Sequence, residues 1–460
     1  MLKKILLAVT ALLVAGIAYV YLAYGSIARA GSGYAAKIIC SGYFLSGFSP
    51  EIMKFEALAG ASSTLANVSH EIDIETSTVT TKLYGLFKRR AGYTPGIGCT
   101  LLPSGEKELP NKITPLPDLT ISDDLPWPQG SATPDVMTRF DTLLDEAFAE
   151  TDPSAPRNTK AIVLIHKGKL IAEKYAEGVK PDTPLIGWSM AKSVTALTAG
   201  VAVKDGKIVP AEPAPVPLWQ EKPDDPRAAI TFDQLLRMSS GLEFNETYSS
   251  ATDVTQMLSN ETDMPVYAAG KPLLGPPDTI WSYSSGTTNI VSGIIKRSVG
   301  GSLQDHYEFT QQRLFRPLNI STATFEADAS GTFIGSSYLY ASARDWARLG
   351  QFCLQDGAWN GEQILPEGWM SYLVTPSETT PANQYGAHFW LNRASDTPSE
   401  DRIYPNLPED AYHMGGFQGQ RVLVIPSEDL VIARFGFTPE RNHGVGDLAE
   451  AVIAELKSEI

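Results

Sequence analysis

Ser189 and Lys192 have the spacing and the setting of a nucleophile and its base. They begin a run of small and apolar residues that has no Pro and ends at Asp205-Gly206, which predicts a helix from Met190. Ser189 is then expected at the helix N-terminus, where free N–H groups and the helix dipole favour a developing anion. Lys192 returns to the same helix face. A serine hydroxyl needs a base to act as a nucleophile, and a neutral lysine can serve as that base.

Other interpretations of these residues stay open. Ser189 could be an ordinary N-cap, with Lys192 solvated in the first turn. The stretch from Gly187 to Ala191 is also one residue from a Gly-x-Ser-x-Gly nucleophile elbow, which needs a distant Asp and His. Two prolines shortly before it disfavour the strand that an elbow requires. A second Ser-x-x-Lys, at Ser104–Lys107, lies between prolines with a Gly inside, so no helix can aim its lysine.

Charge and composition exclude several classes of function. The net charge of −15 and the isoelectric point near 4.9 disfavour nucleic acid or an anionic membrane surface as a partner. The six histidines are scattered, and neither His-Glu-x-x-His nor Cys-x-x-Cys occurs. We therefore expect no metal and no cofactor. With 460 residues the chain can form two or three domains and a large core.

The first 30 residues are typical of a signal peptide or signal anchor. Lys3-Lys4 precedes Ile5–Ile27, a run without charge that is long enough to span a bilayer, and Ala28-Arg29-Ala30 resembles a cleavage site. We expect an exported protein, either periplasmic or held in the inner membrane by an uncleaved segment. Export permits a Cys40–Cys99 disulfide with Cys353 as a buried free thiol, and three free thiols are the alternative.

The rest of the chain divides into three parts. Residues 31–115 predict a small accessory region with a strand pair over 70–87, residues 116–134 a linker, and residues 135–460 the main domain. In the main domain we expect amphipathic helices at 135–151 and 447–457 and two hairpins, at 161–175 and 421–435. These elements indicate an α+β fold, in which an antiparallel sheet is flanked by helices and carries an inserted helical lobe. The Ser189 helix is expected where lobe and sheet meet.

Two further stretches carry chemistry. Tyr283 lies in a polar loop before a predicted helix, and a phenol beside a lysine ammonium can ionise or relay a proton. The alternative is a buried tyrosine with a satisfied hydroxyl. His413-Met-Gly-Gly416 approaches the predicted last hairpin, and its glycines let a backbone or a substrate come close. A plain glycine-rich hairpin approach is the alternative there.

Taken in this order, the three motifs resemble the serine β-lactamase and penicillin-binding-protein family over roughly residues 130–460. The similarity is closest to the class C-like branch with 6-aminohexanoate-dimer hydrolase-like and esterase proteins. The resemblance implies a β-lactamase/transpeptidase-like fold. It also implies that Ser189 is the nucleophile, Lys192 its base, and Tyr283 the first residue of the Tyr-x-Asn element.

The resemblance also assigns the residues around the substrate. His413-Met414-Gly415 takes the place of the Lys-Thr-Gly element, and the oxyanion hole is implied to be the N–H of Ser189 with that of Gly416 or Phe417. This sequence has Ser285 where the family has Asn, and His413 where it has a lysine that binds a carboxylate.

These departures decide which activity the sequence favours. A neutral histidine in place of a charged lysine disfavours β-lactam hydrolysis, so hydrolysis of a small ester or amide fits better. A peptidoglycan D-alanyl peptidase or penicillin-binding protein, and a catalytically silent binding protein, are the alternatives.

Overall fold

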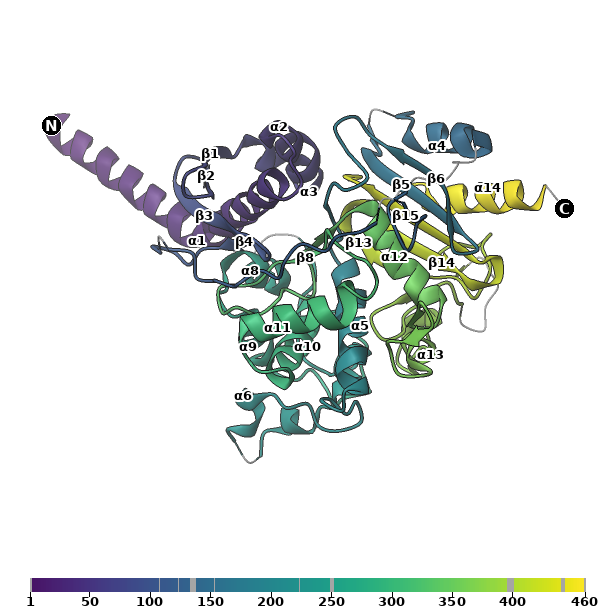
Figure 1. The fold of residues 1–460 in the computed structure, drawn as a ribbon. Helices are drawn as coiled ribbons and strands as arrows, with labels where there is room; N and C mark the ends of the chain where they lie inside the picture. Colours follow the sequence, from purple (N-terminus) through teal and green to yellow (C-terminus); the bar gives the residue numbers. More distant parts are fainter. Residues whose placement is uncertain are drawn as a thin grey trace.

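A long N-terminal helix leads into the body of the molecule. The computed structural model describes residues 2–106, 108–122, 124–132, 138–152, 154–222, 224–248, 252–394, 401–439 and 443–458. Helix α1 (Leu2–Phe44) runs without a break across the predicted boundary between residues 30 and 31, and its first part projects from the body (Figure 1). Among the residues that the structure describes, no helix is both long and apolar enough to cross a membrane.

The accessory region packs around the second half of α1. It contains an antiparallel sheet in the order β1 (Ser69–Asp73), β2 (Thr78–Leu83), β3 (Phe87–Thr94), β4 (Gly98–Leu101). The predicted strand pair over 70–87 is therefore half of a larger sheet. Short helices precede it: α2 (Pro50–Ile52), the π-helix Met53–Leu58, α3 (Ala59–Ala61) and the 3-10 helix Ser63–Asn67. The predicted Cys40–Cys99 disulfide is confirmed and joins α1 to β4, and Cys353 is a buried free thiol, as expected.

A buried ion pair joins the accessory region to the main domain. Lys37 of α1 is paired with Glu326, and both side chains are almost fully buried. The Glu326 carboxylate also accepts hydrogen bonds from the Ser41 hydroxyl (2.8 Å) and the Cys99 backbone N–H (2.6 Å). Charges removed from water need such partners, so this cluster fixes how α1 sits on the main domain.

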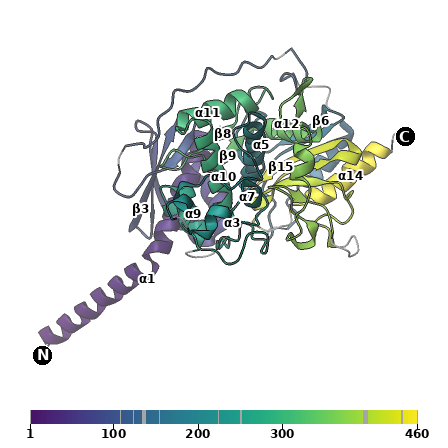
Figure 2. The same ribbon diagram turned by 90° about the horizontal axis from the view of Figure 1, so that it is seen from below.

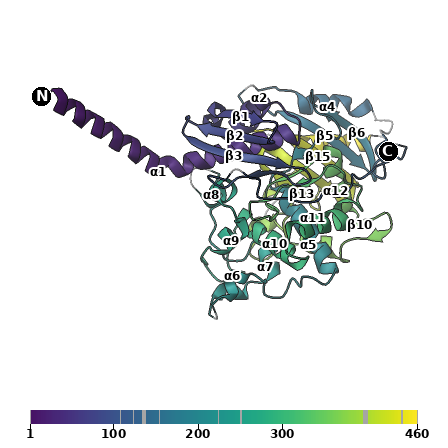
Figure 3. The ribbon, with the colours of Figure 1, turned by 60° about the vertical axis from the view of Figure 1, so that its left-hand side comes forward.

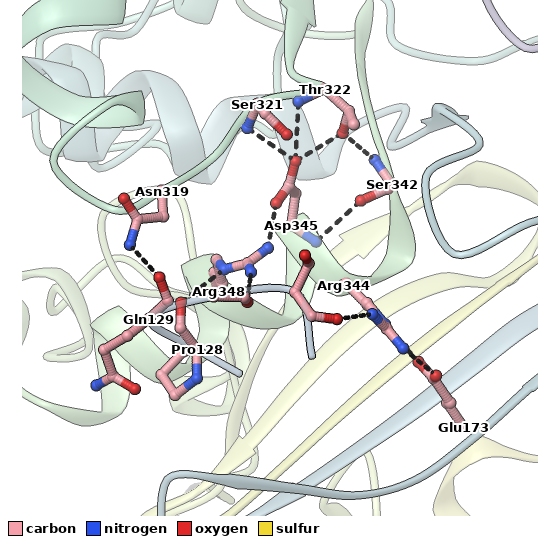
Figure 4. Close-up of polar contacts among 12 residues, drawn as sticks. Pro128, Gln129, Glu173, Asn319, Ser321, Thr322, Ser342, Arg344, Asp345 and Arg348 are labelled. Atoms are coloured by element: carbon pink, nitrogen blue, oxygen red, sulfur yellow. Dashed lines mark hydrogen bonds and ion pairs between the residues drawn. The ribbon is translucent and has the colours of Figure 1, made fainter. Parts of the chain in front are cut away.

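The predicted linker lies along the surface of the main domain. Arg348 donates to the backbone carbonyls of Pro128 (3.1 Å) and Gly130 (2.8 Å), and its guanidinium is held by Asp345 at 2.6 Å (Figure 4). The predicted boundary at 134/135 and the start of the helix predicted over 135–151 lie outside the described residues, as does Lys107 of the second Ser-x-x-Lys match. The described part of that helix is the 3-10 turn Thr138–Phe140 followed by α4 (Asp141–Phe148).

The main sheet is antiparallel and joins both ends of the main domain. Its order is β12 (Trp390–Leu391), β13 (Tyr412–Gly416), β14 (Gln420–Ile425), β15 (Leu430–Gly436), β5 (Thr159–His166), β6 (Lys169–Tyr175). Both predicted hairpins are present, and β15 pairs with β5. Lys167 and Gly168 connect β5 to β6 with φ of 50° and 71°, as a two-residue hairpin turn requires. The expected α+β fold is confirmed.

Alternate residues of β5 enter two different cores. Ile162 and Leu164 face the layer of α4 and α14 (Val445–Lys457), whereas Val163 and Ile165 face the core on the other side of the sheet. Successive side chains of a strand point to opposite faces. A strand covered on both faces therefore reads as a continuous apolar run, which is what the sequence shows.

The helical lobe lies between the two halves of the sheet in sequence and beside it in space (Figure 3). A small sheet in the order β7 (Leu185–Ile186), β9 (Leu339–Ala341), β8 (Thr324–Phe325) lies at the junction, and α5 (Met190–Lys204) follows β7 into the middle of the molecule (Figure 2). The other helices and strands are α6 (Pro217–Gln220), α7 (Phe232–Leu236), α8 (Asp253–Asn260), α9 (Met264–Ala269), α10 (Ser285–Ser298), α11 (Leu303–Thr310), α12 (Ala343–Leu354), β10 (Ala358–Trp359), β11 (Glu362–Gln363) and α13 (Trp369–Leu373). Short 3-10 and π-helical segments are Pro226–Ala229, Gln311–Phe315, Pro381–Asn383, Phe417–Gly419 and Pro426–Glu428.

Breaking the buried pair should destabilise the protein. Lys37→Met leaves the Glu326 carboxylate buried without its cation, and we expect the free energy of unfolding to fall by about 3–5 kcal/mol, measured by urea denaturation. Lys82→Met, at an exposed position on β2, is the matched control and should change stability little. An equal, small effect of both substitutions would contradict a stabilising role for the pair.

Candidate active site

The turn before α5 presents Ser189 at the helix N-terminus. Trp188 has φ of 48°, an uncommon conformation for a residue with a side chain, and it turns the chain from β7 into α5. Ser189 occupies the N-cap position, but its side chain makes no capping hydrogen bond. The hydroxyl therefore does not cap the helix, which was the alternative interpretation of the sequence, and it is available for chemistry.

Lys192 lies directly behind the serine and is only 1% exposed. Its ammonium donates to Ser189 Oγ at 3.2 Å, to Ser285 Oγ at 3.0 Å and to the backbone carbonyl of Ser336 at 3.1 Å. A lysine ammonium has three N–H donors, so each has an acceptor. This burial contradicts the alternative in which Lys192 is solvated. The structure brings the predicted pair, Ser189 and Lys192, together.

Tyr283 meets Lys192 through its ring. The lysine Nζ lies 4.7 Å from the ring centroid, a cation–π distance. The ring also packs against Trp390 (5.4 Å between centroids) and edge-on against Tyr385 (5.7 Å). The structure therefore brings the predicted tyrosine to the lysine and holds its ring in an aromatic cluster.

Ser285 links Lys192 to a carboxylate that the sequence did not reveal. Ser285 begins α10, and its hydroxyl and its backbone N–H both donate to the carboxylate of Glu246, the N–H at 2.7 Å. Burial raises the pKa of Glu246 above its ordinary value, while the nearby Lys192 charge and the hydrogen bonds from Ser285 act in the opposite direction. A continuous path of hydrogen bonds thus runs from Ser189 through Lys192 and Ser285 to Glu246.

No local pattern pointed to Glu246. It lies in a loop 39 residues before Ser285, and sequence distance alone gives no reason to pair the two. Hydrogen bonds across the fold make the pairing. A carboxylate in a polar loop is ordinary in a sequence. Only its position beside a buried lysine makes it notable.

The stretch from His413 to Gly416 forms most of β13 and approaches the nucleophile turn at Gly416. A Cβ on Gly416 would lie 2.2 Å from the carbonyl oxygen of Gly187, so only glycine permits this approach. Phe417, the next residue, packs against Trp188 at 5.7 Å between ring centroids. The two predicted sources of the second oxyanion N–H therefore lie beside the turn that carries Ser189, and the choice between them stays a prediction.

His413 itself packs into an aromatic stack. Its ring stacks on Trp390 (6.4 Å) and meets Tyr404 edge-on (5.4 Å), and a Cβ on Gly415 would fall 3.0 Å from Trp390. Burial holds the pKa of His413 well below its ordinary value, with Arg421 contributing. The imidazole is therefore neutral near pH 7 and supplies no positive charge for a carboxylate.

The nucleophile-elbow alternative needs a histidine beside the serine. His388 packs under α5, but its ring nitrogens lie 2.7 Å from the Leu236 carbonyl oxygen and 3.1 Å from Thr288 Oγ1. Both nitrogens are thus engaged away from Ser189. The group that donates to the serine hydroxyl is Lys192, which favours the Ser-x-x-Lys interpretation.

Comparison with known proteins identifies the family of the main domain. Residues 144–455 match the family model described as Beta-lactamase. A 6-aminohexanoate-dimer hydrolase of Paenarthrobacter ureafaciens is 22% identical over 306 residues, which cover 61% of this chain and 73% of that protein.

Two solved structures share the fold. The "Putative 6-aminohexanoate-dimer hydrolase" from Bacillus anthracis has a TM-score of 0.56 at 22% identity, covering 77% of this chain and 89% of its own. EstA from Arthrobacter nitroguajacolicus Rue61a has a TM-score of 0.50 at 18% identity, covering 70% of this chain and 98% of its own.

Removing the Glu246 charge should change the pH dependence of Ser189. The charged form of Glu246 is lost as pH falls through its raised pKa, so the reactivity of Ser189 should fall on the acid side. In Glu246→Gln the loss of Ser189 reactivity at low pH should disappear, and the rate of Ser189 labelling at neutral pH should fall on the order of 10²-fold. The measurement is the rate of fluorophosphonate labelling from pH 5 to 8.

Glu243→Gln is the matched control, because Glu243 is an exposed carboxylate in the same loop. It should leave both the rate and the profile unchanged. If Glu246→Gln behaved like this control, Glu246 would have no part in activating the serine.

Proposed function

The chain belongs to the Beta-lactamase family, and from this premise we propose that it is a serine hydrolase cleaving an ester or a small amide through an acyl-enzyme on Ser189. The relatives named above support a hydrolase. The observation that carries the proposal is the 3.2 Å hydrogen bond between the buried Lys192 ammonium and a serine hydroxyl free of capping duty.

The first step is attack of Ser189 Oγ on the substrate carbonyl carbon. The hydroxyl proton has to leave as the C–O bond forms. Lys192 donates to three acceptors in this structure, so it accepts that proton only after giving up one of its own. Ser285 accepts from Lys192 and donates to Glu246, which provides a path for that proton.

The developing oxyanion would be held at the α5 N-terminus. The N–H of Ser189 belongs to the unpaired donors of the first helical turn, and the helix dipole adds to its effect. A second N–H from Gly416 or Phe417 completes the predicted oxyanion hole. Collapse of the tetrahedral intermediate breaks the bond to the leaving group, which takes a proton from Lys192 or Tyr283, and water then hydrolyses the acyl-enzyme.

The neutral His413 favours this activity over cleavage of β-lactams. A substrate with a free carboxylate finds no cation at this position, because burial keeps the imidazole uncharged. A penicillin-binding protein would need such a cation for its carboxylate-bearing substrate. Uncharged esters and amides do not.

Export is part of the proposal. The charge-free run at the N-terminus and the Cys40–Cys99 disulfide support an oxidising compartment outside the cytoplasm. The N-terminal segment would be cleaved or would hold the enzyme at the inner membrane.

The nucleophile and its base can be tested together. A fluorophosphonate probe should label the wild type and not Ser189→Ala, and p-nitrophenyl acetate should be cleaved much faster than nitrocefin. Lys192→Arg should lose activity on the order of 10³-fold, because a guanidinium keeps its charge and cannot accept the serine proton. Lys204→Arg, at the exposed far end of α5, is the control. Equal labelling of wild type and Ser189→Ala would refute the nucleophile.

The role of Tyr283 can be divided between ring and hydroxyl. Tyr283→Phe keeps an aromatic face over Lys192 and removes only the phenol. If the hydroxyl transfers a proton, kcat should fall on the order of 10²–10⁴-fold with little change in KM. Tyr385→Phe, in the same aromatic cluster, should be nearly silent. Full activity of Tyr283→Phe would leave only the cation–π contact as its role.

A further inference from the structure

A cavity of about 400 Å³ lies between the accessory region and the main domain. Its outer wall comes from α1 and the elements that follow it, including Tyr34, Leu65 and Leu83, and its inner wall from Trp188, Tyr248 and Phe417. A volume of this size suits part of a small organic ligand. The main domain alone therefore does not enclose this space.

The inner wall of the cavity belongs to the catalytic centre. Trp188 precedes the nucleophile, and Phe417 follows Gly416. Their rings are 5.7 Å apart, and Tyr248 stacks on Phe417 at 5.8 Å with an interplanar angle of 7°. The Tyr248 hydroxyl lies 3.4 Å from the Glu246 carboxylate that holds Ser285. Trp188 and Phe417 therefore line the cavity and also flank Ser189 and Gly416 in the chain, which places one end of the cavity beside the nucleophile turn.

The cavity has no charge of its own. Its lining consists of aliphatic and aromatic residues with a few hydroxyl groups, and among the described residues that line it none is Asp, Glu, Lys, Arg or His. An ammonium or a carboxylate buried there would lack a partner, which is unfavourable. A hydrocarbon chain would gain from leaving water.

The outer wall is held in place. The buried pair of Lys37 and Glu326 and the Cys40–Cys99 disulfide anchor α1, and Gln418 donates to the backbone carbonyl of Ala57 at 2.8 Å. The last contact joins the residue after Phe417 directly to the accessory region. The cavity is therefore formed before a ligand arrives and needs little ordering to bind one.

We propose that this cavity binds the unbranched, uncharged hydrocarbon chain of an ester substrate, so that the accessory region makes the enzyme selective for medium-chain esters. The inference rests on the proposed function of Ser189. It excludes substrates that would place a charged end in this space, and it gives the accessory region a role in specificity.

A chain-length series tests the proposal. For the wild type, kcat/KM should rise from p-nitrophenyl acetate through butyrate and octanoate, by roughly three- to fourfold for each methylene that enters the cavity. Thr64→Trp places a large ring at an exposed position that lines the cavity. It should abolish most of this rise and leave the rate with acetate unchanged.

Ser63→Trp is the matched control, since Ser63 is exposed in the same 3-10 turn and does not line the cavity. It should keep the wild-type chain-length dependence. Labelling by ethyl and dodecyl fluorophosphonates gives a second readout, in which the preference for dodecyl should be lost in Thr64→Trp alone.

The two levels of the proposal fail in different ways. If no ester is cleaved and no probe labels Ser189, the proposed hydrolase function is wrong. If acetate is cleaved and Ser189 is labelled but chain length has no effect, or if the two tryptophan variants behave alike, the hydrolase stands and the chain-binding cavity is refuted.

Discussion

The burial of Lys192 is the constraint around which the candidate active site of this molecule is arranged. An ammonium removed from water needs an acceptor for each N–H. The acceptors come from the start of α5, from the start of α10 and from the backbone of Ser336. Three segments far apart in the chain must therefore converge on one atom, and this convergence places Ser189, Ser285 and Tyr283 together.

The same physical requirement acts a second time at the accessory region. Lys37 is as deeply buried as Lys192, and Glu326, Ser41 and Cys99 gather around it. Here the result is a fixed interface and not a reactive centre, because the lysine is paired directly with a carboxylate. In the active site the carboxylate of Glu246 is held one hydroxyl away, through Ser285, which leaves Lys192 in contact with Ser189. That intervening serine distinguishes Lys192, the proposed base, from Lys37, which is paired directly with a carboxylate.

Much of the fold could be predicted from local pattern. Apolar runs and turn residues identified both hairpins of the main sheet, and the two-residue turn Lys167-Gly168 of the first hairpin has a strong local signature. The accessory sheet was recognised only in part: β3 was missed although it has eight residues, and β4 has only four, too few for a periodic signal. The pairing of β15 with β5 fits the expectation that the hairpins at the two ends of the domain form one sheet. No particular residue predicted this pairing.

For the site, the sequence by itself determined which residues are candidates for the chemistry. Type, spacing and order single out Ser189, Lys192 and Tyr283, and helix periodicity links the serine to a lysine three positions on. Only the tertiary structure decided the rest. It brought Glu246 to Ser285, placed His413 in an aromatic stack that keeps it neutral, and enclosed a cavity between α1 and Phe417. These features depend on contacts between segments that lie far apart in the sequence. Such contacts leave no local pattern in the sequence, because the packing of the whole chain sets them.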